Sequence, residues 1–492
     1  MDTEHQAYPD QARVEPRGDG GGLRNIDGII HDFIRYNHAM QSDLGAVLRK
    51  KLSRRELQLL LKIARQAASL EMPVYLVGGA LRDAVLGGPI ADLDLLVEGD
   101  AIALARTLRS RFGGHVTTHS RFGTAQWALA GAHLFSGDSH RAGVGKKSPD
   151  HIDLISSRSE VYPGTAELPR VSPGAIDDDL RRRDFTINTL AVRLDGSHFG
   201  EVHDPFGALK DLDKGIIRVL HPASFRDDPT RLYRAVRYEK RYGFRIEPTT
   251  LALMRQARPK ARRLSSHRIR RELDLILDEG QWILMLKRLS RLELLGAIHP
   301  ALRSTEKAYR RMQRAEATGP EGLDSRQRRE LRWLVWLVEL STAQIRSLDR
   351  RLQFTRELRE ALLAASTISR QSQRWRTWPP SRLTVYLDRF PLLAVQALRS
   401  SAPRGQAQSM LAQYIDRWRS VRPAVTSKDL GELGLAPGPA YRQILARLRA
   451  AWLDGKISTS AQEREQLGLL IGRFGGNARR LPSGRERRPR FP

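Results

Sequence analysis

The segment from Val77 to Leu95, VGGALRDAVLGGPIADLDL, constrains this chain more than any other stretch. Asp92 and Asp94 alternate with two leucines, so on a strand both carboxylates point to one face and both leucines to the other. Paired carboxylates on one face are what a two-metal phosphoryl-transfer site requires. The alternative is a solvated turn between two strands, which an isolated Asp-x-Asp pattern would not exclude.

A Gly-Gly pair and an Arg-Asp pair precede these carboxylates. Gly78 and Gly79 follow the apolar run VYLV, and because glycines lack a side chain, backbone N–H groups there can approach phosphates closely. Arg82 and Asp83 come next. The combination favours a site for metal and nucleotide over a plain turn.

The charge of the chain points to a polyanionic partner. The 492 residues include 83 Lys and Arg against 55 Asp and Glu, a formal net charge of +28. Nucleic acid is the commonest partner of so basic a surface, although a compositional bias toward arginine gives the same charge. There are no cysteines, which excludes disulfides, thiolate zinc sites and thiol nucleophiles. We find no membrane-spanning run and no signal peptide, and we expect a cytoplasmic protein without membrane contact.

Apolar periodicity predicts an α/β region followed by helices. Short apolar strands such as VYLV, HIDLI and INTLAV alternate with a helix over Ala101–Phe112, while after Asp227 the pattern is almost wholly helical. A polar insertion, Phe135–Asp150, interrupts the α/β region. We expect seven parts: a disordered tail (1–26), N-terminal helices (27–70), a head with a small mixed sheet (71–200), an all-α neck (201–280), body (281–424) and tail (425–476), and a disordered basic end (477–492).

A second informative segment is RRRDFTINTLAV, which begins at Arg181. It could be a solvated loop that enters a buried strand or helix. Alternatively, Arg183 faces phosphate, since guanidinium groups match phosphate oxygens, and Asp184 accepts a hydrogen bond from a ribose hydroxyl.

A third segment, SFRDDPTRLYRAVRYEKRYGF, begins at Ser224. Pro229 suits a first helical turn, so Asp228 could be no more than a helix N-cap. On that helix Arg231, Arg234 and Arg237 recur every third residue and form one basic stripe. Such a stripe could be merely solvated.

Asp228 and Arg231 also suit recognition of a base. The exocyclic amine of cytosine or adenine donates to a carboxylate, and the adjacent ring nitrogen accepts from a guanidinium. Uracil and guanine carry a carbonyl in place of the amine, and a buried unpaired acceptor costs about 1–3 kcal/mol. This pair could therefore select C and A without a template.

In this order the three segments resemble the class II tRNA nucleotidyltransferase (CCA-adding) and bacterial poly(A) polymerase family. The first is similar to its GGxVRD…DxD motif with Leu81 in place of valine, and the second to RRDFTINA with Thr189 in place of alanine. The third matches EDxxR with Asp227 in place of glutamate. SSHRIRRELDLIL resembles the helix that closes the neck, and Val425–Ser458 resembles the tail.

The resemblance implies roles for individual residues. Asp92 and Asp94 would hold two Mg²⁺ ions, and Asp153 could support them as a third carboxylate. Gly79 and Arg82 would contact nucleotide phosphates, and Asp83 would orient Arg82. The remaining nucleotide-binding positions are Gly78, Arg183, Asp184, Asp228, Arg231, Arg234 and Arg237. Arg158–Val171 resembles the mobile loop that helps the family switch from C to A addition.

The implied reaction is untemplated addition of C, C and A to the tRNA 3′ end from CTP and ATP. Poly(A) synthesis, CC-only addition and A-only addition remain open, as does a non-catalytic RNA-binding protein on the same scaffold. The tRNA acceptor arm would lie on the arginines of 303–376 as a group, and no protein partner is evident. His31 and Asp32 are read as ordinary helix surface. Most tryptophans are expected in the core, with Trp375 and Trp378 the best candidates for exposure.

Overall fold

The computed structural model describes residues 44–90, 93–134, 150–161, 164, 167 and 169–473. The chain forms two compact units, one made of residues 1–156 and 190–213 and the other of 157–189 and 214–492. Asp92, the His31-Asp32 pair, the two terminal tails and all but the last residue of the insertion Phe135–Asp150 lie outside the described residues. No helix among the described residues is long and apolar enough to cross a membrane.

The first unit is built on a mixed sheet of seven strands, in the order β3-β4-β5-β2-β1-β8-β9. Strands β2 and β5 pair in parallel, and the other neighbours pair antiparallel. The strands are β1 (Val74–Val77), β2 (Asp94–Val97), β3 (Gly113–His119), β4 (Thr124–Ala132), β5 (His151–Ser156), β8 (Ala191–Arg193) and β9 (Val202–His203). The helices are α2 (Leu44–Lys51), α3 (Arg54–Ala68), α4 (Gly79–Val85), α5 (Ala101–Phe112) and α7 (Ala208–Asp213), with 3₁₀ turns at Ser120–Phe122 and Gly196–His198.

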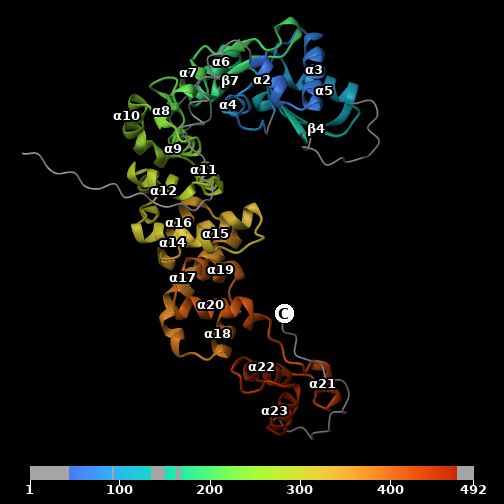
Figure 1. Ribbon diagram of the computed structural model, residues 1–492, viewed down its shortest axis with the longest axis vertical. Coiled ribbons are helices and arrows are strands. Elements are labelled where there is room, and N and C mark those ends of the chain that lie inside the picture. The colour runs from blue at the N-terminus through green and yellow to red at the C-terminus, as the bar shows by residue number, and fades with distance from the viewer. Residues whose placement is uncertain are drawn as a thin grey trace, which may run out of the picture. The chain divides into compact units, whose positions relative to one another are not determined.

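Local sequence explains where these helices begin and end. Asp100 caps α5 by accepting hydrogen bonds from the N–H groups of Ile102 and Ala103, and Gly113 ends the helix at φ +80°. Ser53 and Glu56 form a capping box at the start of α3. Helix α5 packs on β3, β4 and β5, and α3 packs on α5 (Figure 1). The predicted helix over Ala101–Phe112 is therefore confirmed.

The second unit is largely helical. It begins with a hairpin of β6 (Arg158–Val161) and β7 (Arg170–Pro173), and also holds a short parallel pair, β10 (Ile216–Ile217) and β11 (Arg245–Ile246). The helices are α6 (Ile176–Arg181), α8 (Ser224–Asp227), α9 (Arg231–Arg241), α10 (Pro248–Ala257), α11 (Ser266–Asp278), α12 (Trp282–Arg291), α13 (Leu294–Ile298), α14 (Glu306–Thr318), α15 (Ser325–Leu337), α16 (Thr342–Leu352), α17 (Arg356–Gln371), α18 (Pro380–Leu387), α19 (Leu392–Ser401), α20 (Gln406–Asp416), α21 (Ser427–Glu432), α22 (Pro439–Leu453) and α23 (Ser460–Arg473). Short 3₁₀ helices lie at Thr186–Asn188, Arg258–Arg263, Pro300–Leu302, Ser372–Thr377 and Trp418–Ser420.

Helices α21, α22 and α23 share a small core of their own. It is formed by the apolar side chains of Val425, Leu430, Leu433, Ile444, Leu448, Leu467, Leu470 and Ile471. The predicted architecture, a mixed sheet with helices followed by a helical region, is confirmed.

Two local predictions were wrong. INTLAV is not one strand, because Thr186–Asn188 forms a 3₁₀ turn and the strand begins only at Ala191. Trp375 is buried, with 1% of its surface exposed, because it packs beside Tyr386 with a ring separation of 6.3 Å. The polar neighbours of Trp375 in the sequence therefore misled the exposure prediction.

Candidate functional site

Of the predicted metal-site carboxylates, Asp94 and Asp153 lie on the sheet of the first unit, and Asp92 lies outside the described residues. Asp94 begins β2, and its register partner on the adjacent parallel strand β5 is Asp153. Side chains of register partners lie on the same face, and the next pair, Leu95 and Leu154, is fully buried on the opposite face. The alternation predicted for the Asp-x-Asp segment is therefore present from Leu93 to Leu95.

Asp153 has polar neighbours on both sides. Gln126 Nε2 donates to Asp153 Oδ1 at 3.0 Å, and His151 Nε2 lies 3.8 Å from Oδ2. The Asp153 side chain is 41% exposed. Among the described residues no group of three His, Cys, Asp or Glu side chains is arranged to hold a metal ion. The donors present, Asp94 and Asp153, are nonetheless the hard oxygen ligands that Mg²⁺ prefers.

The Gly-Gly and Arg-Asp pairs surround the start of α4. Gly78 has φ +72°, a conformation that favours glycine, and its N–H donates to the carbonyl of Leu190 at 3.2 Å. Arg82 is 6% exposed and binds Asp83 through two hydrogen bonds, Nε to Oδ1 at 2.9 Å and Nη2 to Oδ2 at 3.2 Å. A Cβ atom on Gly79 would lie 3.4 Å from Arg82 Nη2, so the guanidinium reaches back to the turn. Asp83 is thus placed to orient Arg82.

A second group of predicted residues lies in the second unit. Asp184 is 8% exposed and accepts hydrogen bonds from the Phe185 N–H at 2.9 Å, from Asn188 Nδ2 at 2.8 Å and from Arg234 Nε at 2.7 Å. Burial raises the pKa of Asp184, but the charge of Arg234, the Asn188 hydrogen bond and the charge of Arg231 outweigh burial and lower this pKa to about 2. Asp184 is therefore an ionised buried carboxylate.

Arg183 points into the same unit. Its Nη1 donates to the Asn188 carbonyl at 3.0 Å, and its Nη2 donates to Asp179 Oδ2 at 3.2 Å. Burial lowers the pKa of Arg183, and the charge of Asp179 opposes that shift. Arg183 and Asp184 are therefore both hydrogen-bonded to other groups of the protein in this structure.

Helix α9 begins at Arg231, later than predicted. Asp228 accepts from the N–H and hydroxyl of Thr230 at 2.9 and 2.7 Å, and the N–H of Arg231 donates to the Asp228 carbonyl. The tight turn around Pro229 thus precedes the helix, so Asp228 is not the helix N-cap, although its carboxylate still binds an N–H two residues on. The principal ionic partner of Asp228 is Arg268 of α11, at 2.6 Å.

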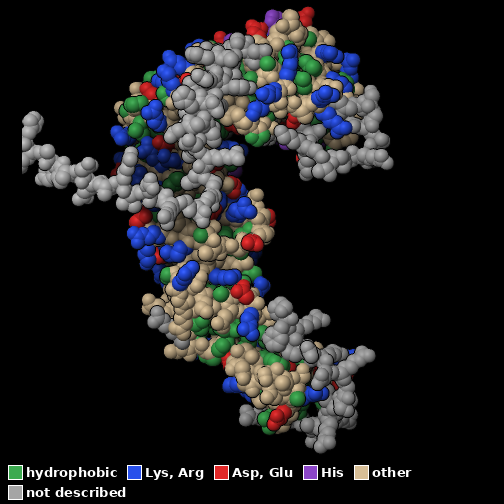
Figure 2. All heavy atoms as spheres, in the orientation of Figure 1, with side chains coloured by type: hydrophobic (Ala, Val, Ile, Leu, Met, Phe, Trp, Pro, Cys, Tyr) green, Lys and Arg blue, Asp and Glu red, His purple; other side chains and the backbone are tan. Residues whose placement is uncertain are grey.

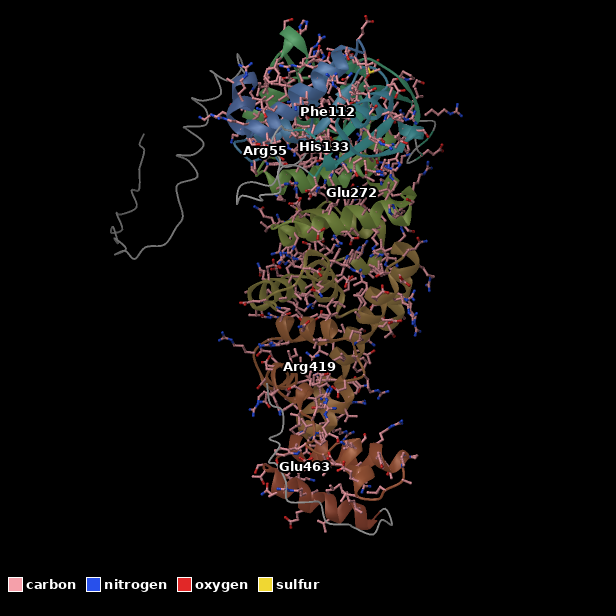
Figure 3. All side chains as sticks on the ribbon, turned by 90° about the vertical axis from the view of Figure 1, so that its right-hand side faces the viewer. Arg55, Phe112, His133, Glu272, Arg419 and Glu463 are labelled. Carbon is pink, nitrogen blue, oxygen red and sulfur yellow. The ribbon has the colours of Figure 1, made fainter. Side chains whose placement is uncertain are left out.

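The three arginines of α9 do not form a solvated stripe. Arg231 is 4% exposed and donates to Ser224 Oγ at 2.6 Å and to the Arg182 carbonyl at 2.7 Å. Arg237 is 7% exposed, and its Nη1 lies 3.4 Å from Oε2 of Glu272, which is labelled in Figure 3. Arg234 binds Asp184. The alternative of a merely solvated stripe is therefore excluded, because each guanidinium has acceptors within the unit.

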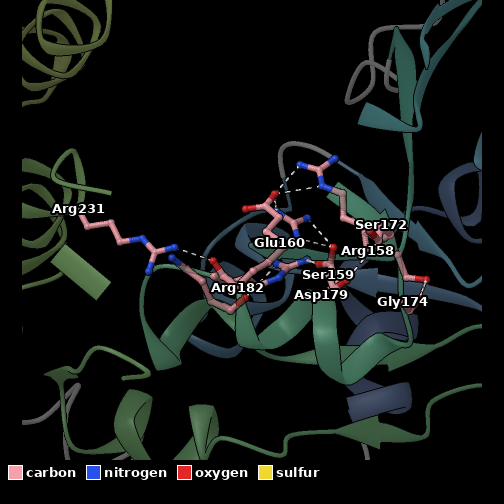
Figure 4. A network of polar contacts seen from close by, with 11 residues as sticks. Arg158, Ser159, Glu160, Ser172, Gly174, Asp179, Arg182 and Arg231 are labelled. Carbon is pink, nitrogen blue, oxygen red and sulfur yellow. Dashed lines mark hydrogen bonds and ion pairs between the residues drawn. The ribbon is translucent and has the colours of Figure 1, made fainter. Parts of the chain in front are cut away.

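A polar network connects the β6–β7 hairpin to this group (Figure 4). Glu160 on β6 accepts from Arg158 at 3.0 Å and from Arg182 at 3.1 Å, and Arg182 also binds Asp179 on α6. The carbonyl of Arg182 then accepts from Arg231. The two ends of the segment that resembles a mobile loop, Arg158–Val171, therefore lie in paired strands, whereas residues 162, 163, 165, 166 and 168 lie outside the described residues.

Four polar residues of this group were missed by the sequence reasoning: Glu160, Asp179, Arg182 and Arg268. Arg182 stands inside the RRRD run, and Arg268 stands in SSHRIRRELDLIL, which was read only as a neck helix. Arg182 and Asp179 are only three residues apart, but Arg268 and Asp228 are separated by 40 residues and Arg182 and Glu160 by 22, so spacing alone could not identify those two contacts.

Known proteins match most of this chain. Residues 74–218 match the family described as poly A polymerase head domain, and residues 243–305 match the family described as probable RNA and SrmB-binding site of polymerase A. The chain is 31% identical over 416 residues to an A-adding tRNA nucleotidyltransferase of Halalkalibacterium halodurans, with 82% of this chain and 90% of the relative covered.

A further relative is the A-adding tRNA nucleotidyltransferase of Geobacter sulfurreducens, 32% identical over 434 residues. That alignment covers 85% of this chain, and the chain spans 47% of the length of that relative. Among solved structures, the Thermotoga maritima CCA-adding enzyme complexed with tRNA superposes with a TM-score of 0.70 at 26% identity, covering 88% of this chain and 98% of that one.

Proposed function

Because the chain belongs to the class II tRNA nucleotidyltransferase and poly(A) polymerase family, we propose that it transfers AMP from ATP to the 3′ end of tRNA. The 3′-hydroxyl oxygen of the RNA forms a bond to the α-phosphorus, the bond from that phosphorus to the bridging oxygen breaks, and pyrophosphate leaves. The observation that carries this proposal is the register of Asp94 with Asp153 on one face of the sheet. In the sequence, Asp94 follows the Gly-Gly and Arg-Asp pairs.

The carboxylates supply the metal ligands. Asp92 and Asp94 would hold Mg²⁺, and Asp153 would support them from the adjacent strand. A Mg²⁺ ion held by these carboxylates would lower the pKa of the attacking hydroxyl and would stabilise the charge of the triphosphate and the leaving pyrophosphate. The hydrogen bond from Gln126 orients Asp153, as outer groups do at metal sites.

The phosphates would be held at the start of α4. Arg82, oriented by its two hydrogen bonds to Asp83, supplies a fixed guanidinium, and Gly79 lets the nucleotide approach the backbone. The Gly78 N–H is engaged with Leu190, so Gly78 contributes the shape of the turn rather than a donor.

Base recognition would fall to Asp228 and Arg231. The carboxylate accepts from the exocyclic amine of adenine and the guanidinium donates to the adjacent ring nitrogen, which matches A and also C but not G or U. Arg231 has five N–H donors, and two of them are in the hydrogen bonds described above. Arg183, Asp184, Arg234 and Arg237 would support the nucleotide through this ion-paired group.

The tRNA acceptor arm would lie on exposed arginines of the helical region by shape and phosphate contacts. Figure 2 shows Lys and Arg side chains on the visible faces of both units. Among the described side chains of 303–376, the exposed arginines are Arg303, Arg310, Arg326, Arg328, Arg346, Arg350, Arg356, Arg370 and Arg374. Arg311 and Arg332 are buried and bind main-chain carbonyls, so they are structural.

Addition of the whole CCA from CTP and ATP is the second candidate. The tRNA-bound CCA-adding enzyme superposes on 88% of this chain, and Asp228 with Arg231 accommodates cytosine as well as adenine. Terminal adenosine addition is common to both candidates, and CTP use separates them.

The test supplies the full chain and Mg²⁺ with tRNA transcripts ending at the discriminator base, at C and at CC, and with ATP, CTP or both. We expect a single A on CC-ended tRNA. Addition of C to the shorter transcripts supports the CCA candidate, and long A-tails indicate a poly(A) polymerase. Binding of tRNA without any addition would contradict the proposal and favour a non-catalytic RNA-binding protein.

A further inference from the structure

The two oxygens of the Asp228 carboxylate have unequal surroundings. Oδ1 accepts three hydrogen bonds, from the Thr230 N–H at 2.9 Å, from the Thr230 hydroxyl at 2.7 Å and from Arg268 Nη2 at 2.6 Å. Across the ranges that the structure describes, Oδ2 accepts none. The side chain is 20% exposed, so Oδ2 is the oxygen left to accept from a ligand.

Arg268 is the one of these donors that comes from another helix. It lies in the first turn of α11, on the same helix as the fully buried Ile269 and Leu273. A second ion pair, Arg237 to Glu272, joins α9 and α11 one turn further along. The position of the Asp228 carboxylate is therefore tied to a packed helix as well as to its own turn.

This fixed position matters because the wrong bases also carry a donor. Uracil and guanine present a carbonyl where cytosine and adenine present an amine, but the next ring nitrogen of uracil and guanine bears a hydrogen. A carboxylate free to move by one ring atom could accept from that N–H and satisfy the wrong base. If the carboxylate cannot move, its oxygen faces the carbonyl oxygen of uracil or guanine, and neither of these acceptors has a hydrogen-bond donor.

We propose, on the basis of the proposed function, that Arg268 is a positioning residue for nucleotide selectivity. It holds Oδ1 of Asp228 so that Oδ2 stays opposite the amine position of the base. Arg268 does not itself contact the base in this account, and its effect passes through Asp228.

The experiment measures kcat and KM of the full chain for single additions of ATP, UTP and GTP to CC-ended tRNA. In Arg268→Ala we expect the preference for ATP over UTP and GTP to fall by about tenfold or more, since the discriminating penalty is that of one unpaired buried acceptor. The fall should arise from a higher KM for ATP together with increased addition of U and G. Arg268→Lys, which keeps a cationic donor, should restore part of the preference.

The matched control is Arg271→Ala, an exposed arginine on the same helix, which should leave the preference unchanged. An equal loss with all three nucleotides, accompanied by a lower thermal midpoint, would mean that Arg268 only stabilises the fold and would overturn the inference. If Arg268→Ala does not fold, Arg268→Lys provides the test, because it should fold with a weakened ion pair. An unchanged preference for ATP over UTP and GTP in Arg268→Lys would also overturn the inference. No addition by the unsubstituted chain would overturn the proposed function and this inference together, whereas addition with unaltered selectivity in Arg268→Ala overturns the inference alone.

Discussion

Arg234 donates its Nε hydrogen to Oδ2 of Asp184 at 2.7 Å, and this bond joins helix α9 to the segment that follows α6. The two residues are fifty positions apart in the chain. The Arg234 charge is a principal reason why the pKa of Asp184 falls to about 2 despite burial. The same contact raises the pKa of Arg234.

The Asp184–Arg234 pair should contribute to stability in a pH-dependent way. A carboxyl whose pKa falls from 3.8 to about 2 on folding stabilises the protein at neutral pH by about 2 kcal/mol. Since the folded pKa is depressed, the full contribution is present above pH 4 and is lost as the pH falls toward 2. Asp184→Asn should therefore lower the free energy of unfolding by about that amount at pH 7, and by less at pH 3.

Urea unfolding of both proteins at pH 7, 4 and 3 measures this difference. Glu465→Gln, a change at an exposed carboxylate, is the control and should be neutral at each pH. A penalty for Asp184→Asn that is the same at pH 3 as at pH 7 would show that shape, and not charge, is what Asp184 contributes.

Two buried tryptophans offer a matched comparison. Trp333 is 0% exposed and donates to Asp274 Oδ1 at 2.7 Å, while Trp375 is 1% exposed and its Nε1 has no partner among the described residues. Burial raises the pKa of Asp274, and the Trp333 hydrogen bond opposes that shift. Trp333→Phe should cost about 1–3 kcal/mol more than Trp375→Phe, because it leaves the Asp274 acceptor unpaired.

Thermal or urea unfolding of the two variants gives the comparison directly, since both changes remove the same atoms from fully buried sites. Equal destabilisation would mean that the indole N–H of Trp375 finds a partner, such as an ordered water, that replaces the missing acceptor.

The sequence predicted the fold well where local signals were strong. The helix over Ala101–Phe112 has its own cap at Asp100 and a glycine stop at Gly113, so its bounds follow from neighbouring residues. The Thr186–Asn188 turn had no such signal, since β-branched residues favour a strand. Its own hydrogen bonds, such as that from the Asn188 N–H to the Phe185 carbonyl, are joined by a tertiary one from the Thr186 N–H to the Arg218 carbonyl.

The candidate site was predictable in its residue types but not in its pairings. The sequence placed Asp94 on a strand and Asp83 beside Arg82, because those relations are local. It grouped Asp228 with Arg231 for base recognition, which stays a prediction, and it did not identify the ion pair between Asp228 and Arg268. Which charges meet depends on how α9 packs on α11, and periodicity within one helix carries no information about that.

Asp153 should be required for activity if it supports the metal ligands. Asp153→Ala should reduce the rate of adenosine addition by about 10- to 100-fold, and the loss should be smaller at high Mg²⁺ concentration because groups that support the metal ligands chiefly affect metal affinity. The rate of addition to CC-ended tRNA, measured across a Mg²⁺ titration, tests this.

Gln126→Ala serves as the milder comparison, since it removes only the amide that donates to Asp153. If Asp153→Ala behaves no differently from Gln126→Ala at every Mg²⁺ concentration, Asp153 is a strand residue without a part in metal binding.

Asp94 is the described residue on which the proposed metal site most directly depends. We would measure the rate at which Asp94→Ala adds adenosine to CC-ended tRNA at saturating ATP and Mg²⁺, together with its dissociation constant for the same tRNA. The account predicts a loss of addition of about a thousandfold or more with tRNA binding unchanged, because removing a metal carboxylate removes several kcal/mol of transition-state stabilisation. Addition within about tenfold of the unsubstituted chain would contradict it.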